Sequence, residues 1–305
     1  MSPRSCIFSV LFLAVFFAGP RLHGTVIKAG TSDLGLLEKK LNALPGDTSK
    51  ANLLIKLAEK YRETDAGRSE RYAYEAISLA KRINYSYALI RAYTINGRIK
   101  QFQNKIPAAY ELFQKAYKVA VSVKDSLQIA ECYHNIGDLY KMLGMQEESI
   151  GYLKKAVVIA QFLRDSNAIP AYSNRVGHVF MDWGEATGDK KKFEEAMKWY
   201  NYSLFINQKT RNARLLSISY VNLANANLVF FKHGADRSCL HKSIAFSEKG
   251  VELAEQSESK SNLALNLLNI GEAYYLLGEH QRAMSFYDRS LALYKELNKK
   301  NWIAA

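Results

Sequence analysis

A short pattern of apolar and small residues recurs six times along this chain of 305 residues, and no other feature constrains its fold as strongly. The centre of each copy is a small residue. Successive centres are 39, 40, 40, 47 and 47 residues apart. So regular a period is typical of repeat proteins, in which similar structural units stack on their neighbours. The six centres are Ala58, Gly97, Gly137, Gly177, Ala224 and Gly271.

A second pattern follows each centre and predicts a second helix in every unit. After Gly97 come Ala109, Phe113 and Ala116, a small, a large and a small residue at spacings of four and three. These spacings place all three on one face of a helix. The small residues allow a close approach to the first helix, and the large one fills the space between the two helices. Each unit is therefore predicted to be a helical hairpin. The equivalent residues are Ser149, Leu153 and Ala156 after Gly137, and Ala283, Tyr287 and Ser290 after Gly271.

These residues resemble the tetratricopeptide repeat, whose first helix carries a large residue, leucine, glycine and tyrosine, and whose second carries alanine, an aromatic residue and alanine. Tyr93, Tyr133 and Tyr220 occupy the first large position, and Gly144 and Gly278 the turn that closes the first helix. The resemblance covers residues 48–305. It implies an all-α fold, a right-handed α-solenoid of antiparallel hairpins, with six units and the start of a seventh at residues 301–305.

The chain also departs from this family. Its period of about 40 residues exceeds the usual 34 or so, which implies longer helices or longer linkers. The spacing of 47 predicts extra residues in longer turns at 183–196 and 231–243, either neutral insertions or an edge that contacts a partner. Residues 190–192 are three lysines, interpreted as a solvated turn. Asn96 stands where the family has leucine, so looser packing is expected in the second unit.

The first 24 residues form a separate segment. Arg4 precedes an apolar run at residues 6–18, which is too short to span a bilayer comfortably and predicts a signal peptide. It is either removed or retained as an N-terminal anchor. Residues 25–47 are then a lead-in to the array. An exported protein, periplasmic or associated with a membrane, is expected.

Charge and chemistry-bearing residues argue against an enzyme. The net charge of +13 favours acidic partners or a membrane surface, and export argues against nucleic acid as a partner. No phosphate-binding loop, hydrolase motif or metal-binding motif occurs, so we expect no catalytic residue, no cofactor and no metal. Cys132 and Cys239 are interpreted as two unpaired thiols, with a bridge as the less favoured alternative.

The resemblance also implies where a partner would bind, because in this family positions around the central glycine face a concave groove. Asparagine can bind the backbone of an extended peptide, and arginine can bind a carboxylate. The same asparagines also follow the ordinary repeat pattern, so a purely structural role stays open. The candidates are Arg91, Arg98, Glu131, His134, Asp138, Asn174, His178, Asn222, Asn225, Asn269, Glu272 and Tyr275.

The function expected from this pattern is a non-catalytic scaffold that binds an unidentified protein or peptide. An alternative is the periplasmic ligand-sensing half of a truncated membrane histidine kinase or transcription regulator, since the arrangement resembles the sensor region of such proteins in Bacteroidetes-type bacteria. There, a membrane helix and an output domain follow the repeats, and would lie in a missing C-terminal part. A carbohydrate-binding lipoprotein is less favoured because no lipobox is present.

Overall fold

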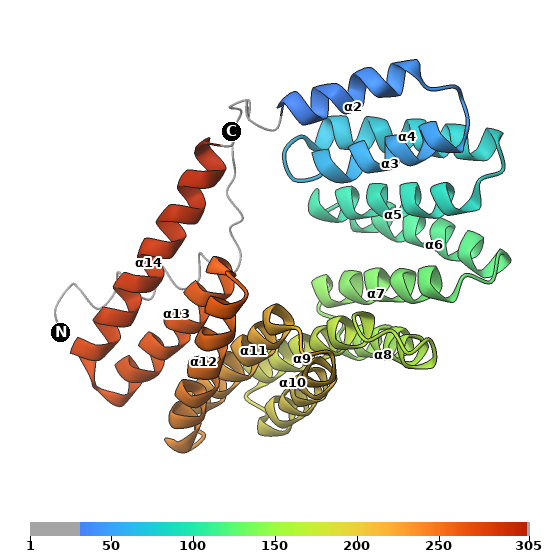
Figure 1. Cartoon of the computed structure of the whole chain (residues 1–305). Coiled ribbons are helices and arrows are strands. Elements are labelled where there is room, and N and C mark those ends of the chain that lie inside the picture. Colours follow the sequence, from blue (N-terminus) through green and yellow to red (C-terminus); the bar gives the residue numbers. More distant parts are fainter. Residues whose placement is uncertain (1–30, 304–305) are drawn as a thin grey trace.

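The protein is an array of helical hairpins that follow one another around an open arc, from α2 to α14 (Figure 1). A computed structural model describes residues 31–303, and the predicted signal peptide lies outside these residues. Within this range every element is an α-helix, which confirms the all-α solenoid. Six hairpins pair a first helix (α3, α5, α7, α9, α11, α13) with the second helix that follows it. The helices are α2 (Thr31–Ala43), α3 (Thr48–Tyr61), α4 (Ala66–Arg82), α5 (Ser86–Phe102), α6 (Ile106–Ser122), α7 (Ser126–Met142), α8 (Gln146–Phe162), α9 (Ala168–Thr187), α10 (Lys190–Thr210), α11 (Ala213–Lys232), α12 (Ser238–Gln256), α13 (Lys260–Leu277) and α14 (His280–Ile303).

The period of 40 residues arises from helices of equal length joined by equal turns. The five helices α4 to α8 each have 17 residues, and the turns after α4, α5, α6 and α7 have three. The middle residue of each turn has a positive φ, at Asn84, Asn104, Lys124 and Gly144. This left-handed conformation ends a helix and reverses the chain within three residues. Longer helices, not longer linkers, therefore account for the difference from the usual repeat.

The first predicted insertion also lengthens helices, so the expectation of a longer turn at 183–196 was wrong. Helices α9, α10 and α11 have 20, 21 and 20 residues, and only Gly188 and Asp189 separate α9 from α10. Gly184 is the physical reason, because a side-chain carbon there would lie 2.8 Å from Phe193; the bare backbone lets the extended α9 pack against α10. The second insertion does contain a longer turn, residues 233–237.

Residues 190–192 begin α10 and are not a turn, which corrects the interpretation of the lysine run. The Asp189 carboxylate accepts a hydrogen bond from the Lys191 backbone N–H (2.9 Å) and so caps this helix. The Lys192 ammonium lies 3.5 Å from the centre of the Trp183 ring, a cation–π contact between α9 and α10. Residues 301–303 likewise continue α14, where the start of a new first helix was expected.

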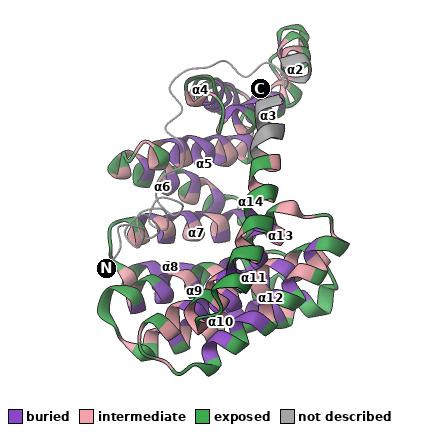
Figure 2. Cartoon of the chain, turned by 90° about the vertical axis from the view of Figure 1, so that its left-hand side faces the viewer, coloured by how far each residue is buried: buried purple, intermediate pink, exposed green. Residues whose placement is uncertain are grey.

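In the four hairpins with a central glycine, that glycine lies against a large side chain of the second helix, as predicted. A side-chain carbon at Gly97 would lie 2.5 Å from the Phe113 ring, and one at Gly177 would lie 2.6 Å from Tyr200. At the small positions serine adds a hydrogen bond, because the Ser149 hydroxyl donates to the Gly137 carbonyl (2.8 Å). In Figure 2 buried residues gather where helices face one another, while the described part of α14 is largely exposed.

Asn96 is a buried polar residue at a core position that is apolar in later units, and its burial destabilises the fold. Its side chain is 0% exposed, and neither amide atom has a hydrogen-bond partner among the described residues. The equivalent residues of later units are apolar, at Ile136, Val176, Leu223 and Ile270. The structure thus buries the polar residue completely in the second unit.

Replacing Asn96 with leucine is expected to raise the free energy of unfolding by about 1–3 kcal/mol, because it removes two buried polar atoms that have no hydrogen-bond partner. Urea unfolding of Asn96→Leu against the wild-type chain measures this difference. Asn52→Leu, at an exposed position of α3, is the control and should change stability by less than about 0.5 kcal/mol. An unchanged or lower midpoint for Asn96→Leu would contradict the interpretation.

Candidate functional site

The first helices line the inner side of the arc. Adjacent first helices touch each other, α3 with α5, α5 with α7, α9 with α11 and α11 with α13, whereas no two second helices pack closely within the described range. Helices on the inner side of a curved stack must lie closer together than those on the outer side. All twelve candidate residues lie on α5, α7, α9, α11 and α13.

An ion-pair cluster joins α3, α5 and α7 on this inner side. Glu131 accepts hydrogen bonds from Arg91 Nη1 (3.1 Å) and from Arg98 Nη2 (3.0 Å). Arg91 also pairs with Glu59 of α3, and Arg98 Nε donates to Asn135 Oδ1 (3.0 Å). Three of the candidates, Arg91, Arg98 and Glu131, are therefore brought together, but they bind one another.

Burial affects the two arginines differently. Desolvation acts against the charge of both, and it lowers the pKa of Arg98, which shares Glu131 and faces Arg91 and Arg62. Desolvation also lowers the pKa of Arg91, but the attraction of the Glu131 and Glu59 carboxylates is larger, so the pKa of Arg91 is raised. Both guanidinium groups remain charged, so Glu131 neutralises charge that would otherwise be poorly solvated.

A second group of charges links α7 to α9. Arg175 lies 3.3 Å from the Asp138 carboxylate, and His134 Nε2 lies 3.7 Å from the same carboxylate. Farther along these helices Lys141 pairs with Asp182 at 2.8 Å. The inner side of the first four hairpins is thus crossed by alternating charges that already have partners.

One of these pairs follows the repeat. Arg91 and Glu131 are 40 residues apart, which is the local period, so they lie side by side on the adjacent first helices α5 and α7. Lys232 and Glu272 also join adjacent first helices, but the local period there is 47 residues. Sequence reasoning missed Glu59, Arg175 and Lys232. None of the three lies one local period from its partner, so a search for opposite charges at that spacing would not have found them.

His178 is held in its neutral form. Its Nδ1 lies 3.0 Å from the Tyr200 hydroxyl across the fourth hairpin, a contact in which a neutral ring can accept. Burial, assisted by the positive charges of Lys141 and Arg175, lowers the pKa of His178 from 6.5 to about 3. The buried phenol of Tyr200 has a raised pKa for the same desolvation reason.

Acidification is therefore expected to destabilise the array. The folded-state pKa of His178 lies below the unfolded value, so the unfolded chain binds a proton first and stability falls as pH drops below about 6.5. Between pH 7 and pH 5 this residue alone should remove about 2 kcal/mol. Unfolding at both pH values should show a smaller difference for His178→Gln than for the wild type. His241→Gln, on the exposed start of α12, should keep the wild-type difference; equal differences in all three chains would refute the assignment.

The fifth and sixth hairpins carry a different kind of inner surface. The Asn269 amide donates to the Val221 carbonyl (3.3 Å), and Glu272 pairs with Lys232 (2.9 Å) and accepts from the Tyr287 hydroxyl (2.8 Å). Asn269 and Glu272 therefore contribute to packing between units. Tyr275 is 52% exposed, with its ring against His280.

Asn222 and Asn225 are the candidates that remain available. Both are half-buried on α11, and neither makes a hydrogen bond within the described residues. A spacing of three places them side by side on one helix face. Asn174 on α9 also has an unpartnered amide oxygen, but that atom is buried. The structure does not gather the twelve candidates into one cluster.

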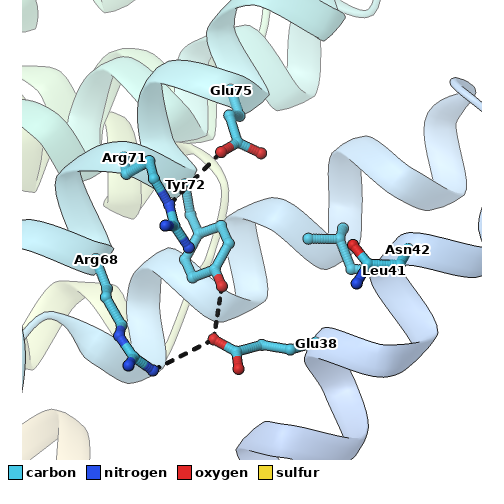
Figure 3. Close-up of a pocket in the computed structure, with 7 residues that line it drawn as sticks. All are labelled: Glu38, Leu41, Asn42, Arg68, Arg71, Tyr72 and Glu75. Atoms are coloured by element: carbon cyan, nitrogen blue, oxygen red, sulfur yellow. Dashed lines mark hydrogen bonds and ion pairs between the residues drawn. The ribbon is translucent and has the colours of Figure 1, made fainter.

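A cleft of about 350 Å³ at the start of the array holds charges that are paired among themselves (Figure 3). Glu38 of α2 accepts a hydrogen bond from the Tyr72 hydroxyl (2.6 Å) and lies 3.6 Å from Arg68. These contacts lower the pKa of Glu38, with the Tyr72 hydrogen bond as the largest cause. Arg71 pairs with Glu75 at 3.6 Å. The contacts of Glu38 with Tyr72 and Arg68 hold α2 against the first hairpin.

Three further observations concern chemistry and membranes. Among residues 31–303 no cluster of three or more potential metal ligands occurs. No helix in this range combines the length and apolar character needed to cross a bilayer. Cys132 and Cys239 are both buried and unbonded, which confirms the prediction of free thiols, and burial raises the pKa of Cys132 to about 12.

Comparison with known proteins agrees with this architecture. Sequence profiles described as "Tetratricopeptide repeat" match residues 89–161 and 267–301. No curated protein sequence matches the chain. Solved structures do match.

BtubC (BKLC) from P. vanneervenii is 17% identical, with 77% of this chain and 93% of that chain covered and a TM-score of 0.63. A Rap protein complexed with competence and sporulation factor is 19% identical, covering 88% and 70%, with a TM-score of 0.58. A signal transduction ATPase with numerous domains from Pyrococcus horikoshii, which has a tetratricopeptide repeat sensor, is 15% identical, with a TM-score of 0.65; 89% of this chain matches 41% of that one.

Helical hairpins stacked through glycine and aromatic contacts, with their first helices on the inner side of an arc, define an α-solenoid. The two matched segments are tetratricopeptide repeats, and the solved structures that resemble this chain share its fold.

Proposed function

We propose that this protein is a non-catalytic scaffold that binds an extended peptide segment on the inner side of its arc, at the fifth hairpin. The observation that carries this proposal is the pair of unpartnered amides of Asn222 and Asn225. Each amide can both donate to and accept from a peptide backbone, which suits recognition of an extended chain.

The ion pairs nearer the N-terminus limit which inner-side residues can bind a ligand. Arg91, Arg98 and Glu131 already satisfy one another, so a ligand would have to break these pairs before binding them. Exposed Tyr275 on α13 is better placed to pack on a peptide, since aromatic side chains are favoured in interfaces. The binding surface is therefore proposed to run over α11 and α13.

Pull-down with the full chain, followed by mass spectrometry of the eluted peptides, identifies the ligand class. The double variant Asn222→Ala/Asn225→Ala should weaken capture of the recovered peptide by about tenfold, because two hydrogen bonds of about 1 kcal/mol each are lost. Asn201→Ala, at an exposed position of the second helix α10, is the matched control and should capture normally. Undiminished capture by the double variant, with unchanged thermal unfolding, would refute the site.

The alternative function is ligand sensing as one part of a larger signalling protein. The Pyrococcus horikoshii structure supports it, since there an array of the same fold is the sensor of a longer chain. Export, proposed from the apolar run at residues 6–18, would place such a sensor in the periplasm. Reading the gene beyond the codon for Ala305 tests this alternative: a membrane helix followed by a kinase or DNA-binding domain would support it, and a stop codon would oppose it.

A further inference from the structure

A groove lies on the outer side of the array. Its volume is about 350 Å³, and it lies between the second helices α4 and α6, which both pack on α5 without packing closely on each other. Ile77, Leu112 and Tyr93 contribute its apolar lining. Tyr93 belongs to α5, so the groove reaches down to a first helix.

Comparison with the next pair of second helices explains why the groove is open. Between α6 and α8 a cluster of tyrosines occupies the same place: the hydroxyl groups of Tyr117 and Tyr133 are 3.0 Å apart, and the rings of Tyr140 and Tyr152 stack at 5.3 Å. One period earlier, Tyr93 matches Tyr133, but the other tyrosines are replaced. Tyr110, Tyr117, Tyr140 and Tyr152 correspond to Glu70, Ile77, Lys100 and Leu112.

The replacements change both shape and charge. Lys100 and Glu70 form an ion pair where Tyr140 and Tyr110 make an edge contact at 6.4 Å. None of the four replacements carries an aromatic ring, so Tyr93 lacks the ring contacts that Tyr133 makes with Tyr117 and Tyr152. A second tyrosine, Tyr74 of α4, also lines the groove, but it is half exposed and makes no ring contact with Tyr93 among the described residues.

The rim of the groove is positively charged. Lys81, Lys100 and Lys115 line it together with one carboxylate, Glu111, which pairs with Lys115 at 2.6 Å. Lys81 has no carboxylate partner within the described range, and its ammonium lies 6.0 Å from the centre of the Tyr93 ring. The charge of the rim is thus complementary to an anionic ligand.

We propose that this groove binds an acidic peptide segment by taking up one of its aromatic side chains. The aromatic ring packs among Tyr93, Ile77 and Leu112 and so replaces the tyrosines that fill the next groove, while a flanking carboxylate faces Lys81, the rim lysine that has no carboxylate partner among the described residues. This site is separate from the inner-side site of the proposed function and does not depend on it.

The test uses the full chain and a fluorescein-labelled pentapeptide with one phenylalanine between two pairs of glutamates, measured by fluorescence anisotropy. Replacing the phenylalanine by alanine should weaken binding about tenfold or more, because burial of the ring is lost. Replacing the glutamates by lysines should abolish binding. Leu112→Tyr introduces the residue found one period later, at Tyr152, and should fill the groove. We expect the phenylalanine peptide to bind this variant at least about tenfold more weakly.

Charge variants complete the test. Lys81→Gln should weaken binding about two- to fivefold at low salt, whereas Lys118→Gln, an exposed lysine of α6 outside the groove, should not. Equal binding of the phenylalanine and alanine probes, or undiminished binding by a Leu112→Tyr chain that unfolds at the wild-type temperature, would overturn the proposal. Loss of the probe in Asn222→Ala/Asn225→Ala but not in Leu112→Tyr would place it on the inner side, which would overturn this site and leave the proposed function standing.

Discussion

Replacing Gly97 with valine is expected to lower the free energy of unfolding by about 3 kcal/mol, since overpacking a closely packed core typically costs about 1–3 kcal/mol and valine adds a branch as well as a Cβ. The first added carbon alone would lie 2.5 Å from the ring of Phe113, which is 0% exposed and cannot move into solvent. Helices α5 and α6 would have to separate. Urea unfolding followed by circular dichroism measures the loss.

Gly151 provides the matched control for this variant. It also lies within a helix, α8, but no atom outside its own helix neighbourhood lies within 4 Å of an added side-chain carbon. Gly151→Val should change stability by less than about 0.5 kcal/mol, because it alters helix propensity without crowding. If both variants lost the same stability, close approach at Gly97 would not be the cause.

Replacing Glu131 with glutamine is the second large expected effect, a loss of about 2–3 kcal/mol. Its side chain is 17% exposed, and it balances the charges of both Arg91 and Arg98. Removing one partner of a buried ion pair costs about 3–5 kcal/mol, and partial exposure together with the remaining Glu59 reduces this value. Glutamine keeps the size of the side chain, so the change reports on charge.

An exposed carboxylate serves as the comparison. Glu111 pairs with Lys115 on the surface of α6, and Glu111→Gln should leave the free energy of unfolding nearly unchanged, because solvent screens an exposed pair. A small effect at Glu131 as well would mean that the inner ion pairs do not stabilise the array. In that case Arg91 and Arg98 would again be candidates for binding a ligand, as the sequence first suggested.

This possibility bears on how the inner side of tetratricopeptide arrays is interpreted. Family position assigned Arg98 and Asn222 the same role, yet Arg98 is bound to Glu131 and Asn135, whereas Asn222 makes no hydrogen bond with any residue in the range 31–303. Ion pairs between adjacent first helices link the units, whereas the amides of Asn222 and Asn225 make no hydrogen bond within the described residues. The distinction is physical, because a paired charge must lose its partner before it can bind anything else.

The sequence alone determined the hairpin, its period and its packing contacts. The spacing of small and large residues around Gly97 and Phe113 predicted which side chains would meet, because a helix turns by a fixed angle for each residue. Turn glycines at 144 and 278 were also correctly placed, since positive φ favours a residue without a side chain.

Only the tertiary structure decided where the additional residues go and which polar groups are free. At 183–196 the sequence suggested a longer turn, but close packing of Gly184 against Phe193 extends α9 and α10 instead. The partners of Arg91 and the lack of partners at Asn222 depend on how adjacent first helices lie, and the open groove beside Tyr93 depends on side chains from three helices. Local periodicity fixes which face of a helix is apolar, whereas pairing across units is fixed by the distance and angle between helices that are far apart in the sequence.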